Sequence, residues 1–149
     1  MKQKLARIRK KIKRYAFGNT RVFDDIYSKY AWGTDETRED KYSSGDGSDN
    51  DNSDVYKETI VQLIQSESVS SVLDIGCGDF RVSGDIINRL GRNIEWTAID
   101  VSRIIIERNK SIYSYKSVNF LHMDATKQEL PKAELVLVRE VMQHLSIPM

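Results

Sequence analysis

A stretch with the residue types of a nucleotide-binding turn begins at Asp74. Two glycines one residue apart, Gly76 and Gly78, end an apolar run over 71–75 and come directly before a helical pattern. Glycine tolerates positive φ and lets the backbone pass close to a ligand without a Cβ in the way. A strand, a glycine turn and a helix in this order present the C-terminal end of a parallel strand to a nucleotide. A lone Gly-x-Gly also occurs in ordinary strand-to-helix connections, so the prediction depends on the residues that follow.

Two further carboxylates end predicted strands downstream of the glycines. Asp100 lies 22 residues beyond Gly78, about where a carboxylate bonds the hydroxyls of a ribose. Asp124 ends the next strand and can accept from an exocyclic adenine amine, with Met123 and Ala125 against the ring. Each aspartate taken singly is also explained as a capping or turn residue. The ordered set of glycines and carboxylates at successive strand ends is what favours a nucleoside ligand.

The other residues of the turn narrow the class of ligand. Asp74 is predicted to orient the glycine loop or to meet an amino group of the ligand. Cys77, the single cysteine, is interpreted as a small packing residue, and the lack of a disulfide partner in the chain indicates a reducing cytoplasm. A dinucleotide-binding turn would have a third glycine at position 81, where this chain has Arg81. A ligand without a pyrophosphate is therefore favoured over a nicotinamide dinucleotide.

Alternating strands and helices are predicted to position these residues. Apolar runs predict strands over 71–75, 94–99, 118–121 and 135–138. Helical spacing predicts helices over 20–30, 54–67, 81–90, a segment that Ser102 caps, and 140–145. Short links between alternating strands and helices indicate a parallel, right-handed, doubly wound α/β sheet. The fourth strand is an unbroken apolar run of the kind that is buried on both faces.

These motifs resemble those of class I S-adenosylmethionine-dependent methyltransferases. Residues 72–78 are similar to the first motif of that family, 99–102 to the acidic motif after its second strand, and 123–125 to its adenine-contacting segment. Residues 135–145 resemble its fourth strand and the turn that follows, so the resemblance covers about residues 54–147. It implies a Rossmann-like methyltransferase fold, S-adenosylmethionine as the cofactor, a methyl-transfer reaction and no metal.

The resemblance carries functional roles to the residues at matching positions. Glu140 and His144, just beyond the fourth strand, are the candidate catalytic bases, and Arg139 is a candidate for binding an anionic acceptor. Helix-cap and surface roles are the alternative for all three. A small molecule or a glycan is the acceptor that the resemblance suggests. Cofactor contacts are expected at Asp74, Gly76, Cys77, Gly78, Asp100, Val101, Met123, Asp124, Ala125 and Arg139.

The family fold is built on seven strands, of which four are predicted in this chain. In the family order 3-2-1-4 the fourth strand lies at an edge, and an apolar edge strand promotes aggregation. We therefore expect a fragment of a longer enzyme, a truncated gene product or half of an assembly. Such a chain would have little activity alone and would self-associate or bind a completing C-terminal half. The alternative to an enzyme is a non-catalytic cofactor-binding or protein-interaction remnant of this fold.

The incomplete cofactor-binding domain is assigned to residues 54–149. The residues before it fall into a basic part and an acidic part. Residues 1–19 form a basic helix or tail, whereas 20–53 combine a helix with an acidic Gly- and Ser-rich loop. The basic part is predicted to dock on the domain or to contact an anionic membrane surface, and less readily nucleic acid. The acidic loop, anchored in part by Trp32 and Tyr42, is a candidate lid. No apolar run approaches the roughly 20 residues that span a bilayer, so a cytoplasmic location is expected.

Overall fold

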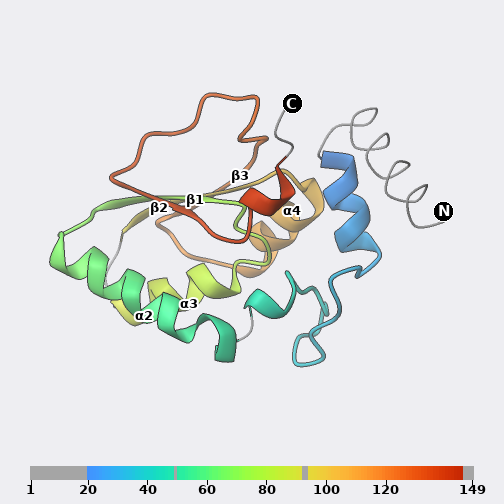
Figure 1. Ribbon diagram of the computed structural model, residues 1–149, viewed down its shortest axis with the longest axis horizontal. Coiled ribbons are helices and arrows are strands. Elements are labelled where there is room, and N and C mark those ends of the chain that lie inside the picture. Colours follow the sequence, from blue (N-terminus) through green and yellow to red (C-terminus); the bar gives the residue numbers. More distant parts are fainter. Residues whose placement is uncertain (1–19, 49, 92–93, 146–149) are drawn as a thin grey trace.

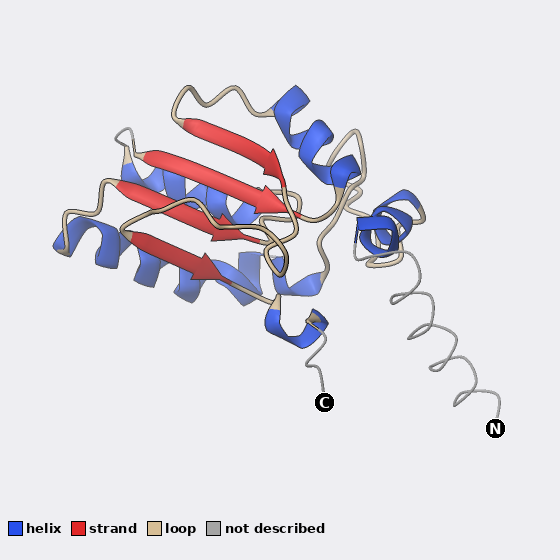
Figure 2. Cartoon of the chain, turned by 90° about the horizontal axis from the view of Figure 1, so that it is seen from above, coloured by secondary structure: helices blue, strands red, loops and turns tan. Residues whose placement is uncertain are grey.

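The computed structural model describes residues 20–48, 50–91 and 94–145 of the 149-residue chain. Its centre is a four-stranded parallel sheet in the order β3-β2-β1-β4. The C-terminal ends of the strands lie at the same edge of the sheet, as Figure 2 shows. The predicted parallel sheet and its strand order are confirmed. The strands are β1 (Ser71–Ile75), β2 (Glu95–Asp100), β3 (Val118–His122) and β4 (Leu135–Val138).

Residues 50–91 and 94–145 also form three α-helices, α2 (Asn50–Ser66), α3 (Arg81–Leu90) and α4 (Arg103–Ile112). α3 has the predicted bounds and ends at Gly91, whose φ of 61° is the left-handed conformation common after a helix. Ser102 caps α4 as predicted, because its Oγ accepts from the backbone N–H of Ile105. α2 begins earlier than the predicted residue 54. Asp54 lies inside α2 and pairs with Lys57 at 3.3 Å.

The helix predicted over 140–145 is wrong. Only a single 3-10 turn, η2 (Met142–His144), forms there. Glu140 has a φ of 54°, in the left-handed region that a residue of a right-handed helix does not adopt. The chain therefore turns after β4 toward the glycine loop, and this turn brings Val141 against Gly76.

The two faces of the sheet are covered differently (Figure 1). On one face, α2, α3 and α4 bury the main core, to which they contribute Ile64, Ile86 and Ile106. On the other face, the connection from β3 to β4 arches over a smaller cluster around Leu73 and Ile99. The crossover from β3 to β4 thus lies opposite the helices, as in a doubly wound sheet, but it is a loop and not a helix.

β4 is buried on one face only, so the expectation that both faces are buried is wrong. Leu137 packs into the main core and is 5% exposed, whereas Val136 and Val138 are 49% and 43% exposed. β4 lies at the edge of the sheet, and in the described part of the chain no strand pairs with its outer side. Two neighbouring valines on one face of an edge strand are therefore open to water.

Residues 20–48, which we call the strap, run past the C-terminal ends of the strands (Figures 1 and 2). The strap begins with a helix over 20–28 and ends in a 3-10 turn, η1 (Asp46–Ser48). Trp32 and Tyr42 both contact the ring of Tyr27, at centroid distances of 5.3 and 6.3 Å. Tyr27 is itself buried, at 3% exposure. The two aromatic residues predicted to anchor this segment therefore pack within it.

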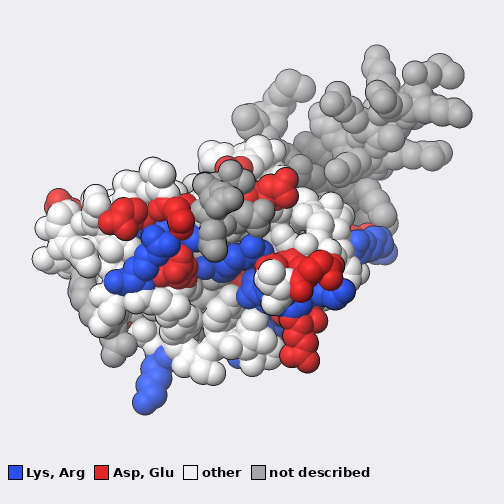
Figure 3. Space-filling view, turned by 90° about the horizontal axis from the view of Figure 1, so that it is seen from below, with Lys and Arg blue, Asp and Glu red and all other residues white. Residues whose placement is uncertain are grey.

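Charged side chains on the described surface are interspersed. On the face seen from below in Figure 3, Lys and Arg side chains lie beside Asp and Glu. The basic residues 1–19 lie outside the described residues, and their predicted contacts with a membrane or with nucleic acid stay predictions. None of the described helices is both long and apolar enough to cross a membrane.

Candidate functional site

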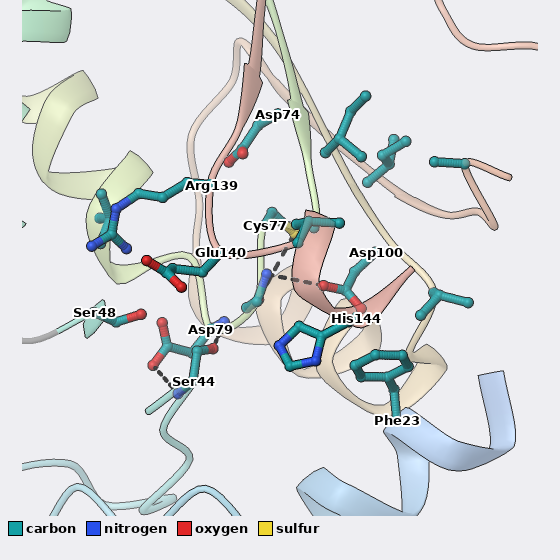
Figure 4. A pocket seen from close by; sticks show the side chains of 18 of the residues that line it. Phe23, Ser44, Ser48, Asp74, Cys77, Asp79, Asp100, Arg139, Glu140 and His144 are labelled. Atoms are coloured by element: carbon teal, nitrogen blue, oxygen red, sulfur yellow. Dashed lines mark hydrogen bonds between the residues drawn. The ribbon is translucent and has the colours of Figure 1, made fainter. Parts of the chain in front are cut away.

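A cavity of about 230 Å³ lies at the C-terminal ends of the strands. Its walls are the glycine loop after β1, the ends of β2 and β3, the turn after β4, and the strap. Figure 4 shows side chains from these separate segments facing one another. The structure brings every predicted site residue to this cavity, namely Asp74, Gly76, Cys77, Gly78, Asp100, Val101, Met123, Asp124, Ala125, Arg139, Glu140 and His144.

The end of β2 holds the glycine loop in place. The backbone N–H of Gly76 donates to the carbonyl of Ile99 at 2.8 Å. The N–H of Gly78 donates to a carboxylate oxygen of Asp100 at 3.0 Å (Figure 4). Both glycines have positive φ, 74° and 54°, which favours glycine at these positions. Asp100 therefore orients the loop, which is one of the two roles predicted for Asp74.

The space beside each glycine is filled by the protein itself. A Cβ added at Gly76 would lie 2.3 Å from Cγ2 of Val141, on the turn after β4. A Cβ added at Gly78 would lie 2.4 Å from Oγ of Ser44, on the strap. The sequence predicts that the glycines make room for a ligand. In the structure they also let two other segments of the chain approach the loop.

Asp74 is buried and bonds to α3. Its carboxylate accepts from the hydroxyl of Ser83 at 2.6 Å. Burial raises the pKa of Asp74 to about 6, and the nearby Asp100 carboxylate acts in the same direction. Asp74 thus takes part in proton equilibria close to neutral pH, far above the usual range of an aspartate.

Backbone donors surround the side chain of Asp100. Its carboxylate accepts from the N–H groups of Gly78, Val101 and Ser102. Burial raises the pKa of Asp100, and these hydrogen bonds lower it by less. A carboxylate has about four acceptor positions, so this carboxylate retains capacity for one further donor.

Asp79 is a site residue that the sequence reasoning missed. Its side chain is 2% exposed and pairs with Arg81 at 3.1 Å and with Arg38 at 3.5 Å. Its backbone N–H donates to Oγ of Ser44 at 2.7 Å, and its carboxylate accepts from the N–H of Ser44 at 3.2 Å (Figure 4). An acidic residue directly after the second glycine was the signal that could have found it.

On the opposite wall, Asp124 shapes a local turn. Its carboxylate accepts from the N–H and the hydroxyl of Thr126, at 3.0 and 2.6 Å, and pairs with Lys127 at 3.3 Å. Burial alone would raise the pKa of Asp124, but the contacts from Thr126 and Lys127 outweigh it, and the pKa is lowered. Asp124 therefore acts as a turn residue in the structure, which is the alternative to a ligand contact that the sequence left open.

The residues after β4 face the strap. Arg139 donates to the carbonyl of Gly47, and its guanidinium lies 5.2 Å from the centre of the Tyr56 ring. Glu140 is exposed and accepts from the side-chain amide of Gln143 at 2.6 Å. Arg139 thus joins the end of β4 to both the strap and α2, whereas Glu140 lies at the rim of the cavity.

His144 packs among aromatic rings of the strap. Its ring centre lies 5.8 Å from that of Phe23, edge to face, and 5.7 Å from that of Trp32. Phe23, Trp32 and His144 all line the cavity. This part of the wall is therefore aromatic, with one titratable imidazole in it.

The surroundings of Cys77 support its interpretation as a small packing residue. The residue is half-buried and packs against the main core, and burial raises the pKa of its thiol. A thiol with a raised pKa is a poor nucleophile because little of it is ionised. The described residues contain no group of His, Cys, Asp and Glu side chains arranged to hold a metal ion.

Three comparisons place this chain among known proteins. A family model described as "Methyltransferase domain" matches residues 72–149, more than half of the chain. Uncharacterized methyltransferases of Mycobacterium tuberculosis (strain ATCC 25618 / H37Rv) and Mycobacterium bovis (strain ATCC BAA-935 / AF2122/97) are each 27% identical over 97 residues, 63% of this chain and 47% of the relative. This chain thus spans about half the length of these relatives. The plantazolicin methyltransferase BpumL, solved in complex with SAH, aligns with a TM-score of 0.45 and 21% identity over 60% of this chain and 37% of that chain.

The family match begins in β1 and includes the glycine loop, Asp100 and the turn after β4. These are the parts of the Rossmann-like sheet that surround the cavity. The chain belongs to the methyltransferase domain family, and within it to the class I S-adenosylmethionine-dependent methyltransferases that its motifs resemble.

Proposed function

We propose that this chain binds S-adenosylmethionine in the cavity, and that the protein transfers the methyl group to a small-molecule acceptor. The observation that carries the proposal is the position of Asp100. This carboxylate ends the strand next to β1 and bonds the glycine loop. In nucleotide-binding α/β sheets this is the position of the carboxylate that binds ribose hydroxyls.

The residues around Asp100 suit the parts of S-adenosylmethionine. Asp100 retains an acceptor position for a ribose hydroxyl, as its three backbone donors leave about one free. Val101, Met123 and Ala125 offer apolar surface to an adenine ring. Arg81 fills the position of a third glycine and pairs with Asp35 at 3.2 Å, which disfavours a pyrophosphate-containing ligand.

The charge of the cavity also suits this ligand. Five carboxylates but only one Lys or Arg, Arg139, line it in the described residues, the carboxylates being Asp74, Asp79, Asp100, Asp124 and Glu140. Carboxylates favour ligands with a positive net charge, and S-adenosylmethionine has one, because it carries a sulfonium and an ammonium against a single carboxylate. The product of methyl transfer has lost the sulfonium charge and is therefore held less strongly by these carboxylates.

The chemistry that S-adenosylmethionine supplies when bound is an electrophilic methyl group. The protein's contribution is to align this group with the acceptor, which can supply several kcal/mol. Glu140 at the rim and His144 in the aromatic wall are placed to take a proton from an acceptor that must lose one. Phe23 and Trp32 beside His144 supply flat apolar surface of the kind that lines small-molecule sites.

Calorimetry on an Asp100→Ala variant tests cofactor binding. We expect the wild-type chain to bind S-adenosylmethionine and S-adenosylhomocysteine and not NAD. Asp100→Ala should weaken binding by about 1.5–3 kcal/mol, the range for a hydrogen bond to a charged group. Glu95→Ala, at the exposed opposite end of β2, is the matched control and should leave the affinity unchanged. Equal affinity in Asp100→Ala and wild type, or preference for NAD, would contradict the proposal.

A further inference from the structure

We infer that the strap must be released from the glycine loop before the cofactor can enter, and that ion pairs from Asp35, Arg38 and Asp40 hold it closed. The ligand's identity rests on the proposed function, whereas the attachment of the strap does not. The cavity of about 230 Å³ is smaller than the roughly 300–1,000 Å³ of typical small-molecule sites. Movement of one wall would therefore make room for a nucleoside that carries an amino acid.

The strap is the wall that covers Gly78. Ser44 places its hydroxyl where a Cβ of Gly78 would be, and it is bonded to Asp79 in both directions. The hydroxyl of Tyr27 lies 3.1 Å from that of Ser44 and adds a second strap group above the same glycine. The space directly beside Gly78 is thus occupied by the strap.

Side chains, rather than backbone pairing, attach the strap. Strap residues outside the helix over 20–28 make backbone-to-backbone hydrogen bonds only with other strap residues, among the residues that the structure describes. One example joins Asp35 to Lys41 at 3.1 Å. The strap's only bridge, between Thr34 and Tyr42, is also internal. Segments bonded mainly to themselves can open as a unit without breaking a sheet. Release of the strap therefore leaves the hydrogen bonds between the strands intact.

Ion pairs to three sites on the α/β domain hold the middle of the strap. Asp40 pairs with Arg108 of α4 at 2.5 Å, and the Arg108 side chain is only 7% exposed. Arg108 also donates to the carbonyl of Asp79, so the Asp40 contact reaches the end of the glycine loop. The second and third pairs, Asp35 with Arg81 and Arg38 with Asp79, are also largely shielded from water.

These pairs are partly buried, so the loss of one partner destabilises the closed strap more than the loss of one partner of an exposed pair. Exposed ion pairs contribute little, whereas removing one partner of a buried pair leaves an uncompensated charge. The strap also contains an exposed pair of its own, Glu36 with Lys41 at 2.8 Å, whose side chains are 67% and 53% exposed. The chain thus offers two acidic residues, four positions apart, of which only Asp40 ties the strap to the domain.

The N-terminal end of the strap is attached to the α/β domain by a different kind of contact. Asp24 accepts from the hydroxyl of Ser102 at 2.6 Å and from the N–H of Ile104 at 3.2 Å, both at the start of α4. This contact caps a helix, and it does not involve the glycine loop. We therefore place the hinge after the helix over 20–28 and the moving part from residue 31 to 48. Ser44 leaves Gly78 with the moving part, whereas Tyr27 stays in place with the helix.

The test compares Asp40→Asn with Glu36→Gln in the full chain, since both changes remove one negative charge from the strap. Hydrogen exchange measures strap release, and the rate at which iodoacetamide labels Cys77, the single cysteine, measures access to the cavity. We expect Asp40→Asn to raise both rates about tenfold or more, with exchange in β1 and β2 unchanged. It should also speed the association of S-adenosylhomocysteine in stopped flow. Glu36→Gln should behave as wild type.

Several outcomes overturn the inference. Equal exchange and labelling in the two variants would mean that the Asp40 pair does not hold the strap. Faster strap exchange with unchanged ligand association would mean that the strap does not control entry. If wild type binds no S-adenosylhomocysteine, the proposed function fails, and the Cys77 labelling still decides the inference. If Asp40→Asn does not fold, Asp35→Asn, which loses the Arg81 pair, replaces it with the same expectations.

Discussion

Asp79 joins three parts of the molecule that the sequence separates. Its position after Gly78 puts it on the glycine loop, its carboxylate pairs with Arg81 at the start of α3, and its main chain and side chain bond Ser44. Contact with Arg38 adds a second bond to the strap. One buried carboxylate thus links the loop, a helix and the cover of the cavity.

Gly78→Ala should be more destabilising than Gly91→Ala. Both glycines have left-handed φ, 54° and 61°, so alanine is strained at either by about 1–2 kcal/mol. Only at position 78 does the new Cβ meet a neighbour, Oγ of Ser44 at 2.4 Å, whereas nothing lies within 4 Å at position 91. We expect overpacking to add about 1–3 kcal/mol at position 78, measured by urea unfolding. Ser44→Gly has a cost of its own, because it removes the hydroxyl that bonds Asp79 and Tyr27. In a double-mutant cycle the two changes together should therefore cost less than the sum of the single changes, and additive costs would refute the steric explanation.

Asp74→Asn should change how stability depends on pH. Burial raises the pKa of Asp74 in the folded protein to about 6, above the value of about 3.9 in an unfolded chain. The folded state therefore binds the proton more tightly, so this residue's contribution is fully present below pH 4 and is lost as the pH rises through 6. Asparagine does not ionise and still accepts from Ser83. The variant's stability relative to wild type should rise by up to about 3 kcal/mol between pH 4 and 7, and a constant difference in denaturant titrations would contradict this.

The elements that the sequence predicted well are those defined by local pattern. β1 and β4 have the predicted bounds because each is an apolar run between polar residues. α3 ends before Gly91 and α4 begins after Ser102, and each of these two residues has a clear capping preference. The helix after β4 could not be excluded from pattern alone, because its failure depends on the left-handed Glu140.

The site residues at the ends of the strands were predictable from the sequence. Those that depend on contacts between residues far apart in the sequence were not. Gly76, Gly78 and Asp100 follow from the α/β pattern, since parallel strands end at one edge. The strap's place over Gly78 depends on contacts such as Ser44 with Asp79, 35 positions apart. No short-range pattern specifies such pairings. The sequence therefore predicted neither the role of Asp79 nor the position of Ser44 beside Gly78.

The exposed face of β4 should promote self-association. Val136 and Val138 are exposed next to an unpaired strand edge in the described residues, and burial of apolar surface contributes about 25 cal/mol per Å². Val136→Lys should therefore lower the mass-average size in light scattering without unfolding the chain, because the side chain already faces water. Val55→Lys on α2, where the valine is 83% exposed away from the sheet edge, is the control. Equal sizes for all three proteins would exclude β4 as the contact.

At the scale of the whole molecule, the cavity is where the chain's first and last described parts meet. The strap supplies Phe23 and Trp32, and the turn after β4 supplies His144 between them. The family match covers the sheet with α3 and α4, whereas the strap and α2 lie outside it. The sheet and the glycine loop are therefore the part shared with this family, and one wall of the cavity is supplied by a segment outside the family match.

The long reach of these contacts has a consequence during synthesis on the ribosome. Gly47 and Arg139 are 92 positions apart, and Asp24 and Ser102 are 78 apart. Contacts with such separations require large loops to close and form late in folding. The strap leaves the ribosome first, but the cavity is complete only after Arg139 and His144 have followed. A nascent chain thus lacks a complete cavity until the turn after β4 has left the ribosome, however early the glycine loop and Asp100 are made.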